Sequence, residues 1–219
     1  HLVHGSELPH LVRSAGETLC FECHDDLAQQ GEAAKVKHAP FATGDCTICH
    51  RPHLSDNKSL LTKLDGALCA ECHDDISRQI AAGKVKHQPA ENGDCLACHR
   101  PHVSDHPMLL AEAAGKLCLS CHEDLQQQMA NAKSKHQPAA EGDCAACHKA
   151  HATDSAGLLA KPVPALCSEC HEDADLQRIQ EHRPAEARTA CLSCHDPHQG
   201  TREHLLKAEA KNHAIGSGK

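Results

Sequence analysis

The residues with the clearest chemical potential are sixteen Cys, which fall into eight copies of the pattern Cys-x-x-Cys-His with none left over. The Cys pairs are Cys20 and Cys23, Cys46 and Cys49, Cys69 and Cys72, Cys95 and Cys98, Cys118 and Cys121, Cys144 and Cys147, Cys167 and Cys170, and Cys191 and Cys194. The His that follow them are His24, His50, His73, His99, His122, His148, His171 and His195. This pattern attaches c-type haem: two thiols bind the vinyl groups, and the adjacent His becomes the proximal iron ligand. The sequence therefore predicts eight haem c groups.

Two other roles for paired Cys explain the pattern less well. Structural zinc needs four ligands and does not require a His directly after each second Cys. A disulfide framework explains an even number of Cys but not the His. Eight motifs without an exception favour haem over both alternatives.

Further His recur in register with the motifs. The pre-proline His stand before Ala-Pro, Gln-Pro or Arg-Pro, and they are His38, His87, His136 and His182. The post-motif His lie three residues after the proximal His of every second motif, and they are His53, His102, His151 and His198. Four and four match the eight predicted haems, so we expect these His to be the distal iron ligands. His4 has the spacing of a ninth candidate, and is either spare or a ligand to another subunit.

The motifs repeat along the chain as pairs. Cys20, Cys69, Cys118 and Cys167 follow one another at intervals of 49 residues, which indicates a linear array of four two-haem units. We expect an N-terminal half-repeat, four haem pairs and a C-terminal half-repeat with a tail. Their ranges are 1–19, 20–68, 69–117, 118–166, 167–200 and 201–219.

The run Lys37-His38-Ala-Pro followed by Gly44-Asp45-Cys46-x-x-Cys49-His50-Arg-Pro-His53 resembles the doubled Cys-x-x-Cys-His multihaem cytochromes. The resemblance covers about residues 4 to 206. It implies an electron carrier of the periplasm or outer surface, and relatives with paired bis-His haems assemble into extracellular conducting filaments. The fourth unit departs from the pattern, because His182 follows His171 by 11 residues instead of 14 and Ala190 replaces the Asp before Cys191.

The spacing also restricts which iron each distal His can serve. His53 lies three residues after His50, whereas the two axial ligands of one iron approach from opposite faces of the haem. His53 must therefore bind the iron of a neighbouring haem. We expect the post-motif His to serve the first haem of its pair and the pre-proline His to serve the second.

Composition indicates a fold without an ordinary core. The 219 residues include two Phe and no Trp or Tyr, and Leu, Ile, Val and Phe make up about 16%, below the roughly 20% that usually supports folding. The haems must then supply the apolar core, and we expect the chain without haem to be largely unfolded. The predicted fold class is mostly irregular coil with short helices and almost no β-structure. The helices are expected at 25–35, 74–82, 123–132 and 173–180, and a turn at each Gly-Asp before Cys46, Cys95 and Cys144.

Several classes of partner are not indicated. The formal charge of −8, without a basic stripe or stacking aromatics, argues against nucleic-acid binding. No apolar run approaches the roughly 20 residues of a membrane span. Because c-type haem is attached after export, we expect an extracellular, cell-surface or periplasmic protein whose leader has been removed.

Bis-His ligation leaves no open iron position, so the main functional hypothesis is electron transfer without catalysis. Three alternatives remain: an enzyme with one open haem, a soluble shuttle, and a subunit docked to a membrane porin or reductase. A head-to-tail filament is a further expectation, with His4 completing a haem of another copy. The expected partners are other copies of the chain, redox proteins and extracellular acceptors.

Overall fold

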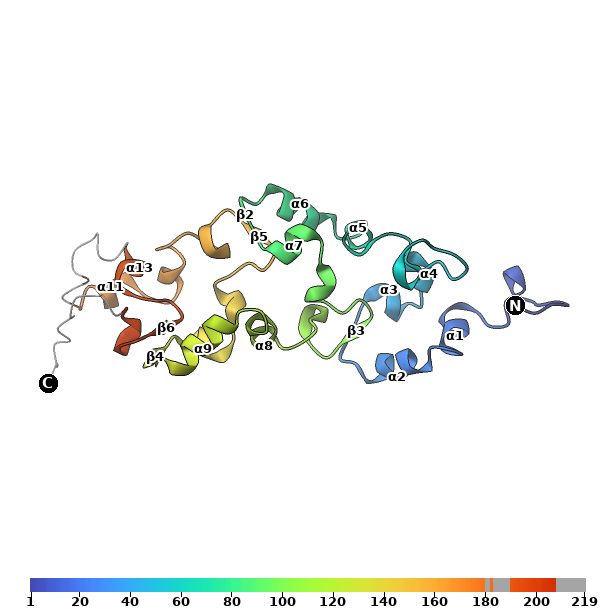
Figure 1. Cartoon of the computed structure of the whole chain (residues 1–219), viewed down its shortest axis with the longest axis horizontal. Helices are drawn as coiled ribbons and strands as arrows, with labels where there is room; N and C mark the ends of the chain where they lie inside the picture. The colour runs from blue at the N-terminus through green and yellow to red at the C-terminus, as the bar shows by residue number, and fades with distance from the viewer. Residues whose placement is uncertain (180–181, 183–189, 208–219) are drawn as a thin grey trace. The chain divides into compact units, whose positions relative to one another are not determined.

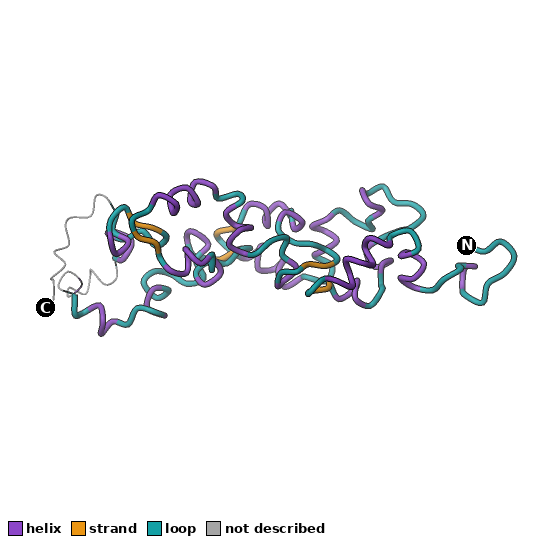
Figure 2. Tube along the Cα trace, turned by 90° about the horizontal axis from the view of Figure 1, so that it is seen from below, coloured by secondary structure: helices purple, strands orange, loops and turns teal. Residues whose placement is uncertain are grey.

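The computed structural model describes residues 1–179, 182 and 190–207. Contacts divide the chain into two units, His1–Arg78 with Gln88–Ala113, and Gln79–His87 with Ala114–Lys219. Both units consist of short helices joined by turns, with very little β-structure (Figures 1 and 2). The predicted fold class is therefore confirmed. The end of the C-terminal tail, residues 208–219, lies outside the described part of the chain.

The first unit contains short helices of fewer than three turns and two short strands. Its α-helices are α1 (Gly16–Phe21), α2 (Asp25–Ala33), α3 (Ala39–Ala42), α4 (Cys46–Cys49), α5 (Asp65–Cys69) and α7 (Gln88–Asn92). Its 3₁₀ turns are η1 (Pro9–Leu11), η2 (Lys58–Leu60), η3 (Cys95–Ala97) and η4 (Pro107–Leu109), and its strands are β1 (Val36–Lys37) and β3 (Val103–Ser104). Helix α6 (Asp74–Ala82) begins in this unit and ends in the second.

The second unit repeats the same kinds of element. Its α-helices are α8 (Ala114–Leu119), α9 (Glu123–Asn131), α10 (Gln137–Glu141), α11 (Asp173–Leu176) and α13 (Cys191–Cys194). Its 3₁₀ turns are η5 (Cys144–Ala146), η6 (Ala156–Leu158), η7 (Cys167–Glu169) and η9 (Glu203–Leu205). Its strands are β2 (Val85–Lys86), β4 (Ser134–Lys135), β5 (Ala152–Thr153) and β6 (Gln199–Gly200).

The helices after the first motifs form where the sequence predicts them. Helix α6 has the expected bounds, and α2 and α9 end one or two residues early. His24 and His122 are the N-cap residues of α2 and α9, and two acidic residues follow each of them in the first turn. Acidic side chains there interact favourably with the helix dipole. Helix α11 is shorter than expected, and Gln180, the predicted end, lies outside the described residues.

The β-structure consists of antiparallel ladders of two residues each, which join segments more than sixty residues apart in the chain. Strand β1 pairs with β3, β2 with β5, and β4 with β6. The register of the first ladder places Val36 opposite Ser104 and Lys37 opposite Val103. Each ladder therefore ties the segment before a pre-proline His to the segment after a post-motif His.

Side chains alone make almost no core. Among the described residues, the buried apolar side chains are Met129, Ala152 and Leu206, and no large side chain is completely buried. A domain of this size normally buries most of its apolar surface. The described side chains therefore do not form an ordinary apolar core. No helix among the described residues has the length and apolar character needed to cross a membrane.

Candidate haem-binding centres

All eight Cys-x-x-Cys-His motifs share one helical turn. In each, the amide of the His donates a hydrogen bond to the carbonyl of the first Cys over 3.0–3.1 Å. Residues three apart on such a turn lie on the same face, so both thiols of a motif are on one side. None of the sixteen Cys forms a disulfide, and each is at least partly exposed. The motifs therefore present paired thiols, none in a disulfide, in the arrangement that two thioether bonds to one macrocycle require.

A recurring hydrogen bond orients the proximal His of the second motifs. The Nδ1 atom of His50 lies 2.9 Å from the carbonyl oxygen of Ser59. The same contact, at the same spacing of nine residues, joins His99 to Met108, His148 to Gly157 and His195 to His204. A carbonyl only accepts, so Nδ1 carries the hydrogen and Nε2 is left with its lone pair. This is the tautomer of an Nε2 metal ligand held by an outer hydrogen bond.

The carbonyl that receives this bond comes from a strained turn. Ser59 and Leu60 both have left-handed backbone angles, with φ of 56°, as do Met108 and Leu109 at 57°. Non-glycine residues avoid this region, at a cost of about 1–2 kcal/mol each. Gly157 occupies the equivalent position in another repeat, with φ of 68°. Strain of this kind persists where a structure needs it, and here it directs a carbonyl toward the candidate iron ligand.

The distal candidates lie side by side at the ends of the ladders. The amide of His38 donates to the carbonyl of His102 over 2.9 Å. His87 and His151 form the same bond over 3.0 Å, as do His136 and His198. Each ladder thus joins a pre-proline His to a post-motif His of the next repeat along the chain.

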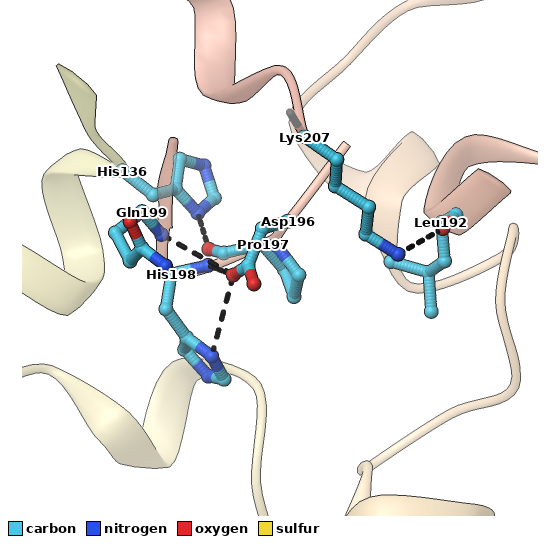
Figure 3. Close-up of polar contacts among 7 residues, drawn as sticks. All are labelled: His136, Leu192, Asp196, Pro197, His198, Gln199 and Lys207. Atoms are coloured by element: carbon cyan, nitrogen blue, oxygen red, sulfur yellow. Dashed lines mark hydrogen bonds and ion pairs between the residues drawn. The ribbon is translucent and has the colours of Figure 1, made fainter. Parts of the chain in front are cut away.

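Figure 3 shows one such junction in the second unit. The Nδ1 atom of His136 lies 3.0 Å from the carbonyl oxygen of Pro197, which fixes the ring and leaves its Nε2 available. The amide of His198 donates to Asp196 Oδ1 over 2.9 Å, and the amide of Gln199 donates to the same oxygen over 3.3 Å. The carboxylate therefore stabilises the turn from which the His198 ring projects.

At least six distal candidates in the described part of the chain face a proximal His. The ring centroids are 6.1 Å apart for His38 and His73, 6.0 Å for His50 and His102, 6.2 Å for His87 and His122, 6.1 Å for His136 and His171, 5.9 Å for His148 and His198, and 5.9 Å for His182 and His195. Two metal–nitrogen bonds of about 2 Å each, plus the ring radii, give a centroid separation of about 6 Å. The spacing of these pairs fits an iron held between two imidazoles. The same spacing is too wide for van der Waals contact between stacked rings.

The pairing corrects the assignment expected from the sequence in the first three units, whereas His182 faces His195, the second motif of its own unit, as expected. The post-motif His102 faces His50, the second motif of the preceding unit, and not the first haem of its own pair. The pre-proline His38 faces His73, the first motif of the following unit. The reason is the ladder, because it folds the segment after His102 back onto the segment before His38. The conclusion that a post-motif His cannot serve the adjacent proximal His is consistent with this arrangement.

Four His in the N-terminal part of the chain depart from the expected pairing. His53 faces His1, with ring centroids 5.7 Å apart, although the sequence analysis gave His1 no role. Among the described residues, no ring lies opposite His24 or His4. The match of nine candidates to eight irons therefore stays a prediction, since His24 has no facing ring among the described residues. The missed signal was the spacing of 49 residues from His1 to His50, which equals the repeat.

Electrostatics favours neutral imidazoles at two of the distal candidates. Burial lowers the pKa of His102, and the neighbouring His50 and His38 lower it further. Burial also lowers the pKa of His198; Asp196 opposes this shift, and His148 and His136 add to it. A neutral imidazole is the form that binds a metal, so folding prepares both rings for ligation.

The thiols do not form a zinc centre in this arrangement. Among the described residues, no group of three or more His, Cys, Asp and Glu comes together in a way that could hold a metal ion. Burial raises the pKa of the Cys46 thiol, and the nearby Cys20 raises it further. A raised pKa disfavours the thiolate form that zinc coordination requires at Cys46.

Comparison with known proteins agrees with the motif geometry. The family described as the doubled CXXCH motif matches residues 1–29, 38–78, 87–127, 136–176 and 182–213. No curated protein matches the chain. The repeated motif indicates a multihaem c-type cytochrome, a class whose members carry electrons. The five matches cover most of the sequence, and the chain belongs to the family with the doubled CXXCH motif.

Proposed function

We propose that the chain is an octahaem c-type cytochrome that conducts electrons through bis-His haems and catalyses no reaction of its own. The observation that carries this proposal is the facing of imidazoles, as in His50 and His102, whose ring centroids are 6.0 Å apart with planes 28° from parallel. A bound haem c supplies a one-electron iron couple. Two His ligands per iron leave no position at which a substrate could bind.

In this proposal each group of residues has a distinct task. The Cys pairs attach the haems and the His after them bind as proximal ligands, while the pre-proline and post-motif His bind as distal ligands. The carbonyls of Ser59 and Met108 hold the proximal rings of His50 and His99 in the ligating tautomer. Each 49-residue unit contributes one haem pair, with the unit boundaries given by the sequence repeat.

Spectroscopy of the purified protein tests the proposal. We expect eight haems per chain by pyridine haemochrome assay, and low-spin bis-imidazole signals by electron paramagnetic resonance. Carbon monoxide should bind few or none of the reduced haems. Carbon monoxide binding to several haems, or a high-spin signal from most of them, would contradict bis-His ligation.

One observation favours a second candidate function, a reductase with a single open haem. No ring lies opposite His24 among the described residues, while His73 and His122, which occupy the same repeat position, face His38 and His87. An iron bound by His24 alone would keep one position open for a small ligand. Binding of one carbon monoxide per chain, lost when the Cys20 and Cys23 haem is removed, would support this function.

A finer part of the proposal concerns assembly and location. His53 and His102, the repeat equivalents of His4, each face a proximal position of the preceding repeat. In this proposal His4 completes a haem of another copy, which gives a head-to-tail filament outside the cytoplasm. Electron microscopy should show fibres for the native chain and single particles for His4→Ala. Single particles from both proteins would exclude filament formation and leave a soluble shuttle.

A further inference from the structure

The residue directly after the proximal His of each second motif differs in charge between the units. It is basic in the first three units, where it is Arg51, Arg100 or Lys149, and acidic in the fourth, where it is Asp196. The backbone does not differ with it. The amide of Asp196 donates to the carbonyl of Leu205 over 2.9 Å, and the amides of the three basic residues donate to the equivalent Leu over 2.7–2.8 Å. The change of charge therefore occurs on the same turn in every unit.

The carboxylate of Asp196 is held beside the ring of His198 (Figure 3). Its Oδ1 accepts hydrogen bonds from the amides of His198 and Gln199 over 2.9 Å and 3.3 Å. The same oxygen lies 3.8 Å from Nδ1 of His198, and both side chains keep 33% of their surface exposed. Since the two amides fix this oxygen, a partly buried carboxylate stays next to one imidazole.

The ring of His198 faces that of His148, with centroids 5.9 Å apart and planes 16° from parallel. In the proposed function these two rings bind one iron, so Asp196 is an outer partner of an axial ligand. Outer carboxylates make a ligating imidazole more basic. A negative charge also stabilises ferric iron, which carries one positive charge more than ferrous iron. Burial lowers the pKa of His198, and Asp196 acts against this shift, which agrees with a carboxylate whose charge reaches the ring.

We propose that Asp196 gives the haem with His198 as its distal ligand a lower reduction potential than its repeat equivalent. The repeat equivalent of His198 is His102, which faces His50 and has the exposed Arg100 in the place of Asp196. The inference rests on the bis-His ligation proposed above and adds a direction to it, because an electron leaves an iron of lower potential more readily. Each transfer oxidises one ferrous iron and reduces one ferric iron, and no bond or proton changes place.

Potentiometric titration of the holoprotein, followed by haem absorbance, tests the inference. Asp196→Asn keeps an oxygen for the two amides and removes the charge. We expect one of the eight proposed haems to become at least tenfold easier to reduce at a fixed potential, an upward shift of about 59 mV for one electron. Asp196→Glu restores the charge and should titrate like the native chain. The matched control is Asp154→Asn, a carboxylate that accepts the amide of Lys84 over 3.3 Å, and it should change nothing.

Two further variants identify the haem on which the carboxylate acts. Arg100→Asp places a carboxylate at the equivalent position before His102, so it should make one haem harder to reduce. In His198→Met, the Met ligand already raises the potential of the haem in question. Adding Asp196→Asn to that variant should then shift no haem of low potential. A shift of a low-potential haem there would assign the effect to the haem of His195 and overturn the inference.

The same samples separate this inference from the proposed function. Electron paramagnetic resonance of the native chain should show low-spin haems, as bis-His ligation requires. Low-spin haems together with an unshifted titration of Asp196→Asn, or with an equal shift in Asp154→Asn, would overturn the inference and leave the proposed function intact. An unchanged titration of Arg100→Asp would overturn it as well. High-spin haems in the native chain would instead contradict the proposed function.

Discussion

The backbone amide of His38 donates to the carbonyl of His102 over 2.9 Å, although the two residues are 64 positions apart in the chain. Their rings face different proximal His, His73 for the former and His50 for the latter. The distal His of two candidate irons therefore come from neighbouring backbone positions at the end of one ladder. The spacing between consecutive haems would then be set by the ladder and not by flexible side chains.

Removal of a distal candidate should open a single iron. In His102→Ala, the haem of Cys46 and Cys49 loses its sixth ligand, since His102 faces His50. We expect one additional carbon monoxide per chain in the reduced protein and one high-spin signal in the oxidised protein. The control His106→Ala should match the native chain. If His102→Ala binds no additional carbon monoxide, another residue supplies that ligand.

A reciprocal exchange should reveal the strain in the carbonyl turns. Gly157 and Met108 occupy equivalent left-handed positions, with φ of 68° and 57°. A Cβ at Gly157 would meet no atom within 4 Å, so Gly157→Met should cost about 1 kcal/mol from backbone strain alone. Met108→Gly should raise the free energy of unfolding by up to about 1 kcal/mol. The midpoint temperatures of thermal unfolding of the two variants should shift by about 2–4 °C in opposite directions. Shifts of the same sign would contradict this explanation.

The close approach of two glycines should tolerate no side chain. A Cβ on Gly115 would lie 2.6 Å from the Cα of Gly142, two residues before Cys144. We expect Gly115→Ser to lower stability by about 1–3 kcal/mol, the usual cost of overpacking. Ala114→Ser, at the adjacent exposed residue, is the control. If the midpoint of thermal unfolding is unchanged in Gly115→Ser, the close approach of Gly115 and Gly142 does not limit stability.

Loss of haem should unfold the chain. The buried apolar side chains among the described residues are Met129, Ala152 and Leu206, too few to offset the entropy of ordering the backbone. Protein made in cells without a haem-attachment system should therefore show circular dichroism of an unordered chain and no cooperative thermal transition. A cooperative transition in that protein would indicate a core independent of haem.

Much of the fold could be predicted from the sequence because the relevant signals are local. The acidic residues after His24 and His122 mark the starts of α2 and α9. Gly44, Gly93 and Gly142 have φ of 75–80°, as the predicted turns at Gly-Asp require.

The pairing of His could not be predicted in the same way, because it depends on contacts between distant segments. The ladder of β1 and β3 has two residues per strand, which is too short to leave an alternating pattern in the sequence. His1 escaped notice because it belongs to none of the eight Cys-x-x-Cys-His motifs, although its spacing to His50 fits the repeat. The left-handed Ser59 and Leu60 were also unexpected, because neither residue type prefers that conformation.

Each ladder joins a repeat to the next one and uses only backbone atoms, so the junction depends little on side-chain identity. The three ladders indeed differ in sequence: Val36 and Lys37 in β1 correspond to Ser134 and Lys135 in β4. Duplication of one 49-residue segment would therefore create a new junction of the same form. The length of such a protein could change in evolution, or by design, in steps of two haems without a new interface being invented.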